Sequence, residues 1–367
     1  MNEFLYNPEI IFIDKDCVDL PLTQRVLRNA ASVIHRVVDS KEEVLSEIKL
    51  SRDPVSEGKK YVLITRQKGD FVKRCPCTPN YIGCRYYIIN SDLNCPLDCT
   101  YCILQLYLDH SLVTIHANSD DLWKDLDRFF EKVGRRTVRI GTGELGDSLV
   151  LDHLTERSKD LISYFRRKKN ALFELKTKTV NIRHILKTDP ADNIIIAWSL
   201  NSERMAGEEE HRAPSVADRI QAAASVADRG YRLAFHFDPL IFYYGWKDGY
   251  GEVIDKLFRT IKPEQIAWIS LGSLRFPPHL KNIIRKRFPA TKILGEEMIR
   301  GLDGKMRYFK PLRLELYERV VNLIQKGGGK RIPLYFCMEC REAWKKATNK
   351  KPRDEEDVEK YLSSTRG

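Results

Sequence analysis

The chain has 367 residues, 43% of them hydrophobic, which is enough to bury a large core in one main domain with smaller appendages. No hydrophobic run approaches the length of a membrane span, and Met1–Phe4 lacks the basic start of a secretion signal, so we expect a cytoplasmic protein with no membrane partner. In that reducing compartment, nine cysteines favour metal or redox chemistry over disulfides. The net charge of +11 favours a polyanionic partner such as nucleic acid.

Residues 1–74 predict a small α/β unit. Apolar runs at Ile10–Ile13 and Tyr61–Thr65 favour strands, and the segment Thr23–Val38 between them favours a helix. No chemistry is visible in this unit.

Three cysteines follow directly after this unit, at Cys75, Cys77 and Cys84. A C-x-C pair with a third cysteine could ligate a second cluster or a zinc ion, alone or together with Cys337 and Cys340. Ordinary thiols beside a crowded loop are the other interpretation.

A stronger motif comes next: Cys95, Cys99 and Cys102 have the spacing C-x3-C-x2-C, just after an apolar strand at Tyr86–Ile89. Iron–sulfur clusters are usually held by four cysteine thiolates, so three local ligands would leave one iron of a [4Fe-4S] cluster open. An open iron can be chelated by the amino and carboxylate groups of S-adenosylmethionine. The alternative is a zinc knuckle or three buried thiols, although zinc sites usually show paired C-x2-C halves or histidines.

Residues 75–295 alternate predicted strands and helices, which is typical of a parallel sheet with crossover helices. The predicted strands are Tyr86–Ile89, Thr137–Ile140, Leu172–Lys176, Ile194–Leu200, Arg232–Phe237 and Ile266–Leu271. The predicted helices lie around Leu122–Val133, Leu151–Arg167, Ile182–Leu186, Ser215–Gly230, Gly251–Ile261 and Pro278–Phe288. In barrels of such units the chemistry lies at the C-terminal ends of the strands. Polar residues stand at five of these ends: Gly141-Thr142-Gly143-Glu144, Lys176-Thr177-Lys178, Ser199-Leu200-Asn201, His236-Phe237-Asp238 and Ser273-Leu274-Arg275.

The cysteine motif, with Tyr101 immediately before its last cysteine, resembles the radical S-adenosylmethionine superfamily. Six strands with the cluster loop after the first match the partial (β/α)6 TIM-like barrel of that superfamily. Within it, four segments resemble the spore photoproduct lyase family, over roughly residues 85–300: Asp152–Thr155, Asp218–Ala223, Gly230-Tyr231 and Gly245–Tyr250. The fold class expected from this resemblance is α/β, with the small N-terminal unit and a C-terminal extension added to the barrel.

The resemblance implies an enzyme, a radical carbon–carbon lyase that repairs a thymine-dimer lesion of the spore photoproduct type in DNA. Reductive cleavage of S-adenosylmethionine would give a 5'-deoxyadenosyl radical that abstracts hydrogen from the lesion. The electron would come from a donor such as a flavodoxin or ferredoxin, and the enzyme would be a monomer. Two alternatives stay open: a radical enzyme for another nucleic-acid base, a tRNA or a small molecule, and a non-catalytic iron–sulfur or zinc protein that binds nucleic acid.

The resemblance also implies roles for single residues. Cys95, Cys99 and Cys102 would ligate the cluster, and Tyr101 would pack beside it as part of the catalytic site. The residues expected to bind the cofactor are Gly141, Thr142, Gly143, Glu144, Lys176, Ser199 and Asn201.

One departure from the family concerns Glu144, which stands where spore photoproduct lyase has a cysteine that returns a hydrogen atom to thymine. A carboxylate cannot donate a hydrogen atom in this way, so either another thiol serves or the reaction differs. Cys337 and Cys340 follow a predicted strand at Arg331–Phe336, and they would reach the cluster face if that strand joined the sheet in parallel. They could equally form a redox couple, ligate a second metal, or be structural thiols.

The C-terminal extension divides into residues 296–344, with a hairpin, the helix Pro311–Lys326 and the extra strand, and a polar tail at 345–367 that would be helical or disordered. The segment Arg300–Lys310, with a turn at Asp303-Gly304, falls where the family has a hairpin that approaches DNA. A solvated basic hairpin is the other interpretation. The cations expected at phosphates are Arg300, Lys305, Arg307 and Lys310, and the side chains expected to wedge into the lesion are Met306, Tyr308 or Phe309.

Overall fold

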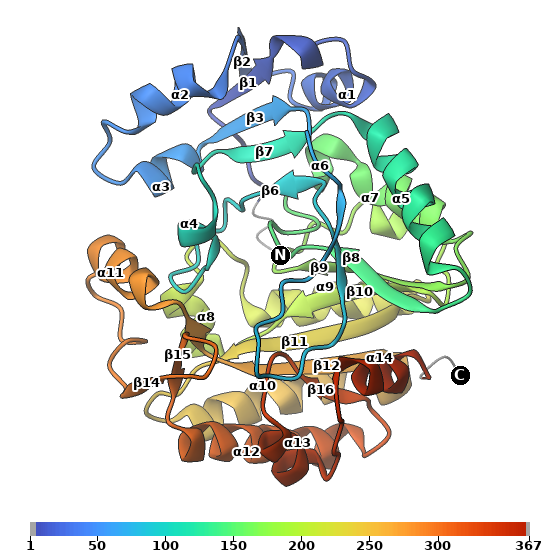
Figure 1. Ribbon diagram of the computed structural model, residues 1–367, viewed down its shortest axis with the longest axis vertical. Coiled ribbons are helices and arrows are strands. Elements are labelled where there is room, and N and C mark those ends of the chain that lie inside the picture. Colours follow the sequence, from blue (N-terminus) through green and yellow to red (C-terminus); the bar gives the residue numbers. More distant parts are fainter. Residues whose placement is uncertain (1–4, 365–367) are drawn as a thin grey trace.

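The computed structural model describes residues 5–364, so Met1–Phe4 and the last three residues of the predicted polar tail lie outside it. Its main sheet curls into a half-barrel of parallel strands (Figure 1). Six of them are the predicted barrel strands: β5 (Tyr87–Ile89), β8 (Val138–Thr142), β9 (Ala171–Thr177), β10 (Ile194–Ser199), β11 (Arg232–Leu240) and β12 (Ile266–Ser273). They stand side by side in chain order, so the prediction of a partial barrel is confirmed.

Two further strands extend this sheet. At one edge β4 (Val72–Arg74) pairs antiparallel with β5. At the other edge β16 (Leu334–Phe336), the predicted extra strand, pairs in parallel with β12, which is the condition under which Cys337 reaches the cluster face. Cys337, the residue after β16, therefore lies at the same end of the sheet as the polar residues that follow the other parallel strands.

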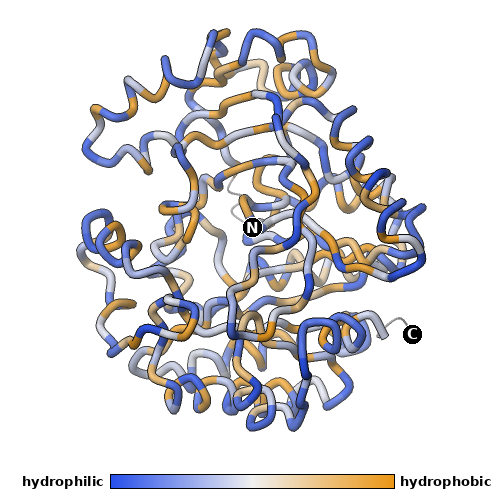
Figure 2. Tube along the Cα trace, viewed as in Figure 1, coloured by the Kyte–Doolittle hydropathy of each residue, from blue (hydrophilic) through white to orange (hydrophobic). Residues whose placement is uncertain are grey.

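Helices surround the half-barrel (Figure 1). Their bounds are α5 (Ser119–Val133), α6 (Asp152–Thr155), α7 (Arg157–Phe165), α8 (Glu203–Glu209), α9 (Val216–Asp228), α10 (Trp246–Thr260), α11 (Pro278–Arg287) and α12 (Lys310–Gly328). The central strands are buried on both faces, and β10 is buried along its whole length. Figure 2 shows the resulting pattern, with hydrophobic stretches along the strands and hydrophilic turns on the outer helices.

The N-terminal unit forms a second sheet, in the order β2-β1-β3-β7-β6. Its strands are β1 (Ile10–Asp14), β2 (Ile34–Val38), β3 (Tyr61–Thr65), β6 (Asp92–Leu93) and β7 (Val113–His116), and its helices are α1 (Pro21–Asn29), α2 (Lys41–Ile48) and α3 (Pro54–Gly58). The predicted helix Thr23–Val38 is wrong over its second half, because Ile34–Val38 pairs in parallel with β1. Strand β7 comes after the cluster loop, yet it pairs with β3 of this unit.

The C-terminal extension forms the predicted hairpin, with strands β14 (Met298–Arg300) and β15 (Met306–Tyr308) beside the short β13 (Arg275–Phe276). The tail forms α13 (Arg341–Thr348) and α14 (Glu355–Ser363). Helix α14 is packed against the domain, since Val358 and Leu362 are buried. None of the helices within residues 5–364 is both long enough and apolar enough to cross a membrane.

Candidate active site

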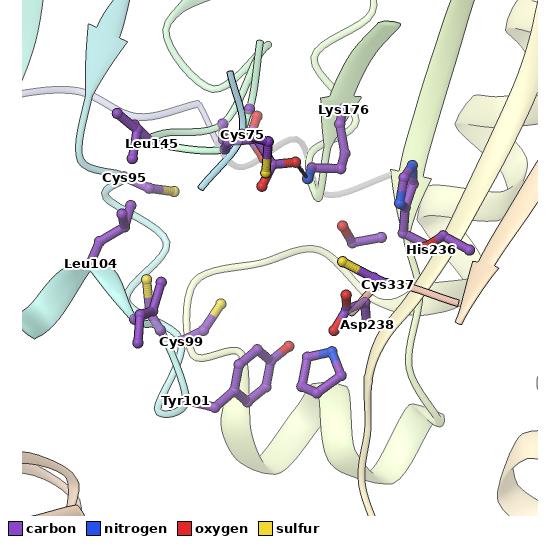
Figure 3. Close-up of a pocket in the computed structure, with 18 of the residues that line it drawn as sticks. Cys75, Cys95, Cys99, Tyr101, Leu104, Leu145, Lys176, His236, Asp238 and Cys337 are labelled. Atoms are coloured by element: carbon purple, nitrogen blue, oxygen red, sulfur yellow. Dashed lines mark hydrogen bonds and ion pairs between the residues drawn. The ribbon is translucent and has the colours of Figure 1, made fainter. Parts of the chain in front are cut away.

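A cavity of about 380 Å³ lies at the C-terminal ends of the barrel strands. Figure 3 shows Cys95 and Cys99 facing it from one wall and Cys337 facing it from the opposite wall. Ten of the predicted site residues line it: Cys95, Cys99, Tyr101, Cys102, Gly143, Glu144, Lys176, Ser199, Lys305 and Cys337. The structure therefore brings together residues that are more than 240 positions apart in the sequence.

Buried ion pairs anchor the loop that carries the three cysteines. Asp98, whose backbone φ is 56°, receives Lys59 Nζ at 2.7 Å and Arg287 Nη2 at 3.0 Å. Burial opposes the charge of Asp98, but these two cations hold its pKa below the usual value. Lys59 could not be recognised as a site residue from the sequence, because it lies in the N-terminal unit.

The three cysteines fit an iron–sulfur cluster better than a single metal ion. Among the described residues, no three Cys, His, Asp or Glu side chains converge closely enough to hold one ion. A [4Fe-4S] cube binds each cysteine at a different iron atom, so its ligands need not converge. Cys95, Cys99 and Cys102 supply three thiols from one loop into one cavity, which is the donor set such a cube requires. The same observation gives no support to zinc ions at the other cysteines.

Tyr101 is held in place by a buried polar network. Its hydroxyl donates to the carboxylate of Glu210, which also pairs with Arg219. Burial opposes the charge of Glu210, but Arg219 and then Lys178 hold its pKa below the usual value. Because the ring also lines the cavity, Tyr101 has a fixed position beside the cysteine loop.

The turn after β8 places Glu144 against Lys176. Gly143 has a φ of 91°, and a Cβ there would come within 2.7 Å of the Lys176 carbonyl oxygen, so only glycine fits. The Glu144 carboxylate forms an ion pair with the Lys176 ammonium. Burial opposes the charge of Lys176, but the pairing with Glu144 raises its pKa above the usual value. Gly141 and Thr142 lie within the buried strand and do not line the cavity.

A buried carboxylate that the sequence did not reveal, Glu174, also lines the cavity. Its Oε1 hydrogen-bonds His236 Nε2 at 2.9 Å and accepts from Trp268 Nε1 at 3.0 Å. Burial opposes its charge, but His236 and then Arg139 lower the pKa of Glu174 to about 2. The sequence signal that could have identified it is a carboxylate within the otherwise apolar run Ala171–Leu175 of β9.

Asn201 and Cys340 are predicted site residues that do not line the cavity. Asn201 is buried, and its side chain accepts from the Tyr250 hydroxyl at 2.8 Å and donates to the Pro239 carbonyl at 3.2 Å. Cys340 precedes the first residue of α13. Since neither side chain reaches the cavity, the structure gives no support to Asn201 as a cofactor-binding residue or to Cys340 as a catalytic residue.

Two of the cations and aromatic residues expected at DNA are buried, and for these the prediction is wrong. Arg307 turns inward, donates to Asp303 Oδ2 at 2.7 Å and lies 4.0 Å from the centre of the Tyr81 ring. Tyr308 is fully buried, and its hydroxyl accepts from the backbone amide of Phe242 at 3.2 Å. Asp303, in the turn, forms an ion pair with Arg307 four positions later, and composition alone does not predict this pairing.

Comparison with known proteins decides the family. The sequence model of the family described as spore photoproduct lyase matches residues 6–311. The chain belongs to the spore photoproduct lyase family. This confirms the resemblance drawn from the sequence, and it places the chain among radical S-adenosylmethionine enzymes.

Individual relatives agree with this assignment. The spore photoproduct lyase of Clostridium acetobutylicum is 25% identical over 324 residues, which cover 86% of this chain and 94% of the relative. The enzyme of Bacillus subtilis is 26% identical over 224 residues, covering 60% of this chain and 65% of the relative. A solved structure of a spore photoproduct lyase mutant superposes with a TM-score of 0.80 at 21% identity, over 90% of this chain and 99% of that chain. Another, with bound AdoMet and dinucleoside spore photoproduct, gives 0.76 at 21% identity over 90% and 98%. These likenesses confirm the fold.

Proposed function

We propose that this chain repairs a thymine-dimer lesion of the spore photoproduct type in DNA. The family match supports the reaction class. The observation that carries the proposal is the cavity in which the cysteine loop faces the Cys337 thiol. A radical repair reaction needs a hydrogen-abstracting group on one side of the substrate and a hydrogen donor on the other, and this arrangement provides both positions.

The cofactors of the proposed reaction are a [4Fe-4S] cluster and S-adenosylmethionine. Cys95, Cys99 and Cys102 would hold the cluster. When bound, these groups supply one electron and a carbon-centred radical that abstracts hydrogen. Glu144 offers a carboxylate for the amino group of S-adenosylmethionine, and its pairing with Lys176 fixes that carboxylate at the cavity wall.

Cys337 is the proposed hydrogen donor. Its backbone amide donates to the Leu271 carbonyl at 2.9 Å, which continues the pairing of β16 with β12 and holds the thiol at the strand ends. Burial raises the pKa of Cys337 well above the usual value, so the sulfur keeps its hydrogen. One hydrogen atom would move from sulfur to the thymine radical after the crosslink breaks, leaving a sulfur radical. Glu144 has no bond of comparable weakness.

DNA would approach over the hairpin. Lys305 lines the cavity, Arg300 is exposed on β14, and Lys310 is exposed but paired with Glu342 at 2.7 Å. The Phe309 side chain is 53% exposed and can insert beside an extruded base. We further propose a flavodoxin or ferredoxin as electron donor and a monomeric enzyme.

Product analysis tests the proposal. The protein is incubated anaerobically with dinucleotide spore photoproduct, S-adenosylmethionine and reductant, and the expected products are the dinucleotide with both thymines restored and 5'-deoxyadenosine or regenerated cofactor. A Cys99→Ala variant treated in parallel gives the background. Absence of both lesion repair and S-adenosylmethionine cleavage would favour a non-catalytic nucleic-acid-binding protein.

A second substrate is favoured by one observation, namely that a carboxylate stands at Glu144, where the family carries its donor cysteine. A radical enzyme acting on another base or a small molecule would cleave S-adenosylmethionine but leave the dinucleotide lesion unchanged. The same assay therefore separates the two candidates.

A further inference from the structure

The segment Cys75-Pro76-Cys77 forms a tight turn beside the cavity. The Cys77 amide donates to the Cys75 carbonyl at 2.7 Å, which closes a three-residue turn around Pro76. Proline has a fixed φ near −65°, about the value that the central residue of such a turn adopts. The turn brings the two sulfur atoms into hydrogen-bonding contact. Two thiols in contact need only a small movement to form a disulfide.

The surroundings of Cys77 favour a reactive sulfur. The backbone amide of Cys84 donates to it, and a Cβ at Gly83 would lie 2.6 Å from it, so glycine leaves the space that the sulfur occupies. The hydrogen bond from Cys75 is the largest cause that lowers the pKa of Cys77 to about 6. The same hydrogen bond, and then burial, raise the pKa of Cys75, so this thiol keeps its proton. A thiolate beside a thiol is the arrangement from which disulfide exchange begins.

The two sulfurs differ in where they stand. Cys75 lines the cavity, and Figure 3 shows its side chain pointing inward. Cys77 is not among the lining residues and is partly exposed. One thiol of the pair therefore faces the cavity, and the other, Cys77, is accessible to a small reactant from outside it.

We propose that Cys75 and Cys77 form a redox-active dithiol site that closes to an intramolecular disulfide by exchange with a low-molecular-weight disulfide. The Cys77 thiolate attacks one sulfur of that molecule, forms a mixed disulfide and releases the other half as a thiolate. The Cys75 sulfur then displaces the remaining half, and its proton passes to a leaving thiolate. The two cysteines lose two electrons, and the small disulfide is reduced to one thiol and one thiolate. The oxidised site removes one S–H group from the cavity.

Redox titration of the full-length protein tests this inference. The anaerobically purified holoprotein is equilibrated with mixtures of reduced and oxidised glutathione, quenched with acid, alkylated, digested and analysed by mass spectrometry. We expect Cys75 and Cys77 to lose alkylation together, in one two-electron transition, with a crosslinked peptide two hydrogens lighter. The buried Cys17 is the internal control and should stay alkylated throughout after denaturation.

Two variants sharpen the result. Cys77→Ser should abolish the crosslink, and Pro76→Ala should shift the equilibrium toward the dithiol by about two- to fivefold, because the unfolded turn gains freedom. Both cysteines remaining alkylatable across the titration would overturn the inference. So would a crosslink from Cys75 to Cys84 or Cys337. A loss of iron in the Cys75→Ser, Cys77→Ser double variant would also overturn it, since it would make these thiols metal ligands.

Discussion

The cysteine loop and the hairpin Met298–Tyr308 are two regions that the sequence marks as functional, one by spacing and the other by charge. In the loop, the three cysteines line the cavity together, and Asp98 is held by Lys59 and Arg287. In the hairpin, the cations differ in burial, since Arg300 is exposed and Arg307 is buried. Spacing within a short loop fixes which atoms can converge. A cluster of positive charges leaves open whether each one faces solvent or an internal carboxylate.

Removing one cysteine of the loop should have the largest effect. Cys99→Ala removes one of three thiolates, so the cluster is lost or loses its open iron, and S-adenosylmethionine cleavage should fall below detection. Iron, sulfide and 5'-deoxyadenosine are measured after anaerobic reconstitution. Cys17→Ala, at a buried thiol of the N-terminal unit, is the control and should keep both iron and activity. One zinc per chain and no iron in the unaltered protein would contradict the assignment.

Removing the opposing thiol should separate cofactor cleavage from repair. Cys337→Ala should leave cleavage of S-adenosylmethionine intact, while clean repair falls by at least about tenfold because no near-contact hydrogen donor remains. Stalled reactions or trapped adducts are measured by chromatography of the dinucleotide products. Cys340→Ala is the matched control, because that thiol does not line the cavity. Equal, undiminished repair by both variants would remove Cys337 from the mechanism.

The buried arginine of the hairpin should affect stability rather than DNA binding. The Arg307 and Asp303 side chains are 1% and 0% exposed, so Arg307→Met leaves a buried carboxylate unpaired, at a cost of about 3 kcal/mol. Burial opposes the charge of Asp303, but Arg307 holds its pKa below the usual value. Its stabilisation is therefore complete above the unfolded pKa of about 3.9 and is lost as the pH falls through the lower folded value.

Urea unfolding at neutral pH and near pH 3 measures this difference. The difference in free energy of unfolding between Arg307→Met and the unaltered protein should be smaller near pH 3 than at neutral pH. Lys41→Met, at an exposed pair with Asp109, should change stability by no more than about 0.5 kcal/mol at either pH. A stability loss by Arg307→Met no greater than that of the control would show that the buried pair contributes little.

The exposed cation of the hairpin should have the smallest effect. Arg300→Ala removes one proposed phosphate contact, so the slope of log affinity against log salt should flatten by about 0.9 for duplex DNA. Binding is measured by fluorescence anisotropy across a salt series. Lys15→Ala, on the surface of the N-terminal unit, should leave the slope unchanged. If Arg300→Ala does not change the slope, the hairpin is a solvated basic surface and not a DNA contact.

The fold was predictable where apolar runs are long and bounded by polar residues. The six barrel strands are such runs, since a parallel sheet buried on both faces selects continuous apolar segments. The segment Thr23–Val38 failed because α1 ends at Asn29 and the β-branched residues of Ile34–Val38 pair with a strand that only the tertiary fold supplies. Helix propensity and spacing carry no information about that partner.

The site was predictable where chemistry resides in neighbouring residues or at strand ends. Glu144, Lys176 and Ser199 follow from the rule that barrel sites lie at the C-terminal ends of strands. Lys59 and Glu174 could not be found in that way. Lys59 acts across 39 positions on Asp98, and Glu174 across 62 positions on His236, so their roles depend on packing alone.

The pairing of β7 with β3 ties the N-terminal unit to the cysteine loop. The chain leaves the barrel sheet after β5, runs through the cysteine loop, and enters the other sheet at β7, where Val113 stands opposite Val62. Deleting residues before Cys75 would take away both that neighbour and Lys59, freeing one end of the loop. We therefore expect truncation before Cys75 to loosen the cysteine loop, because the first strands of the protein hold one end of it in place.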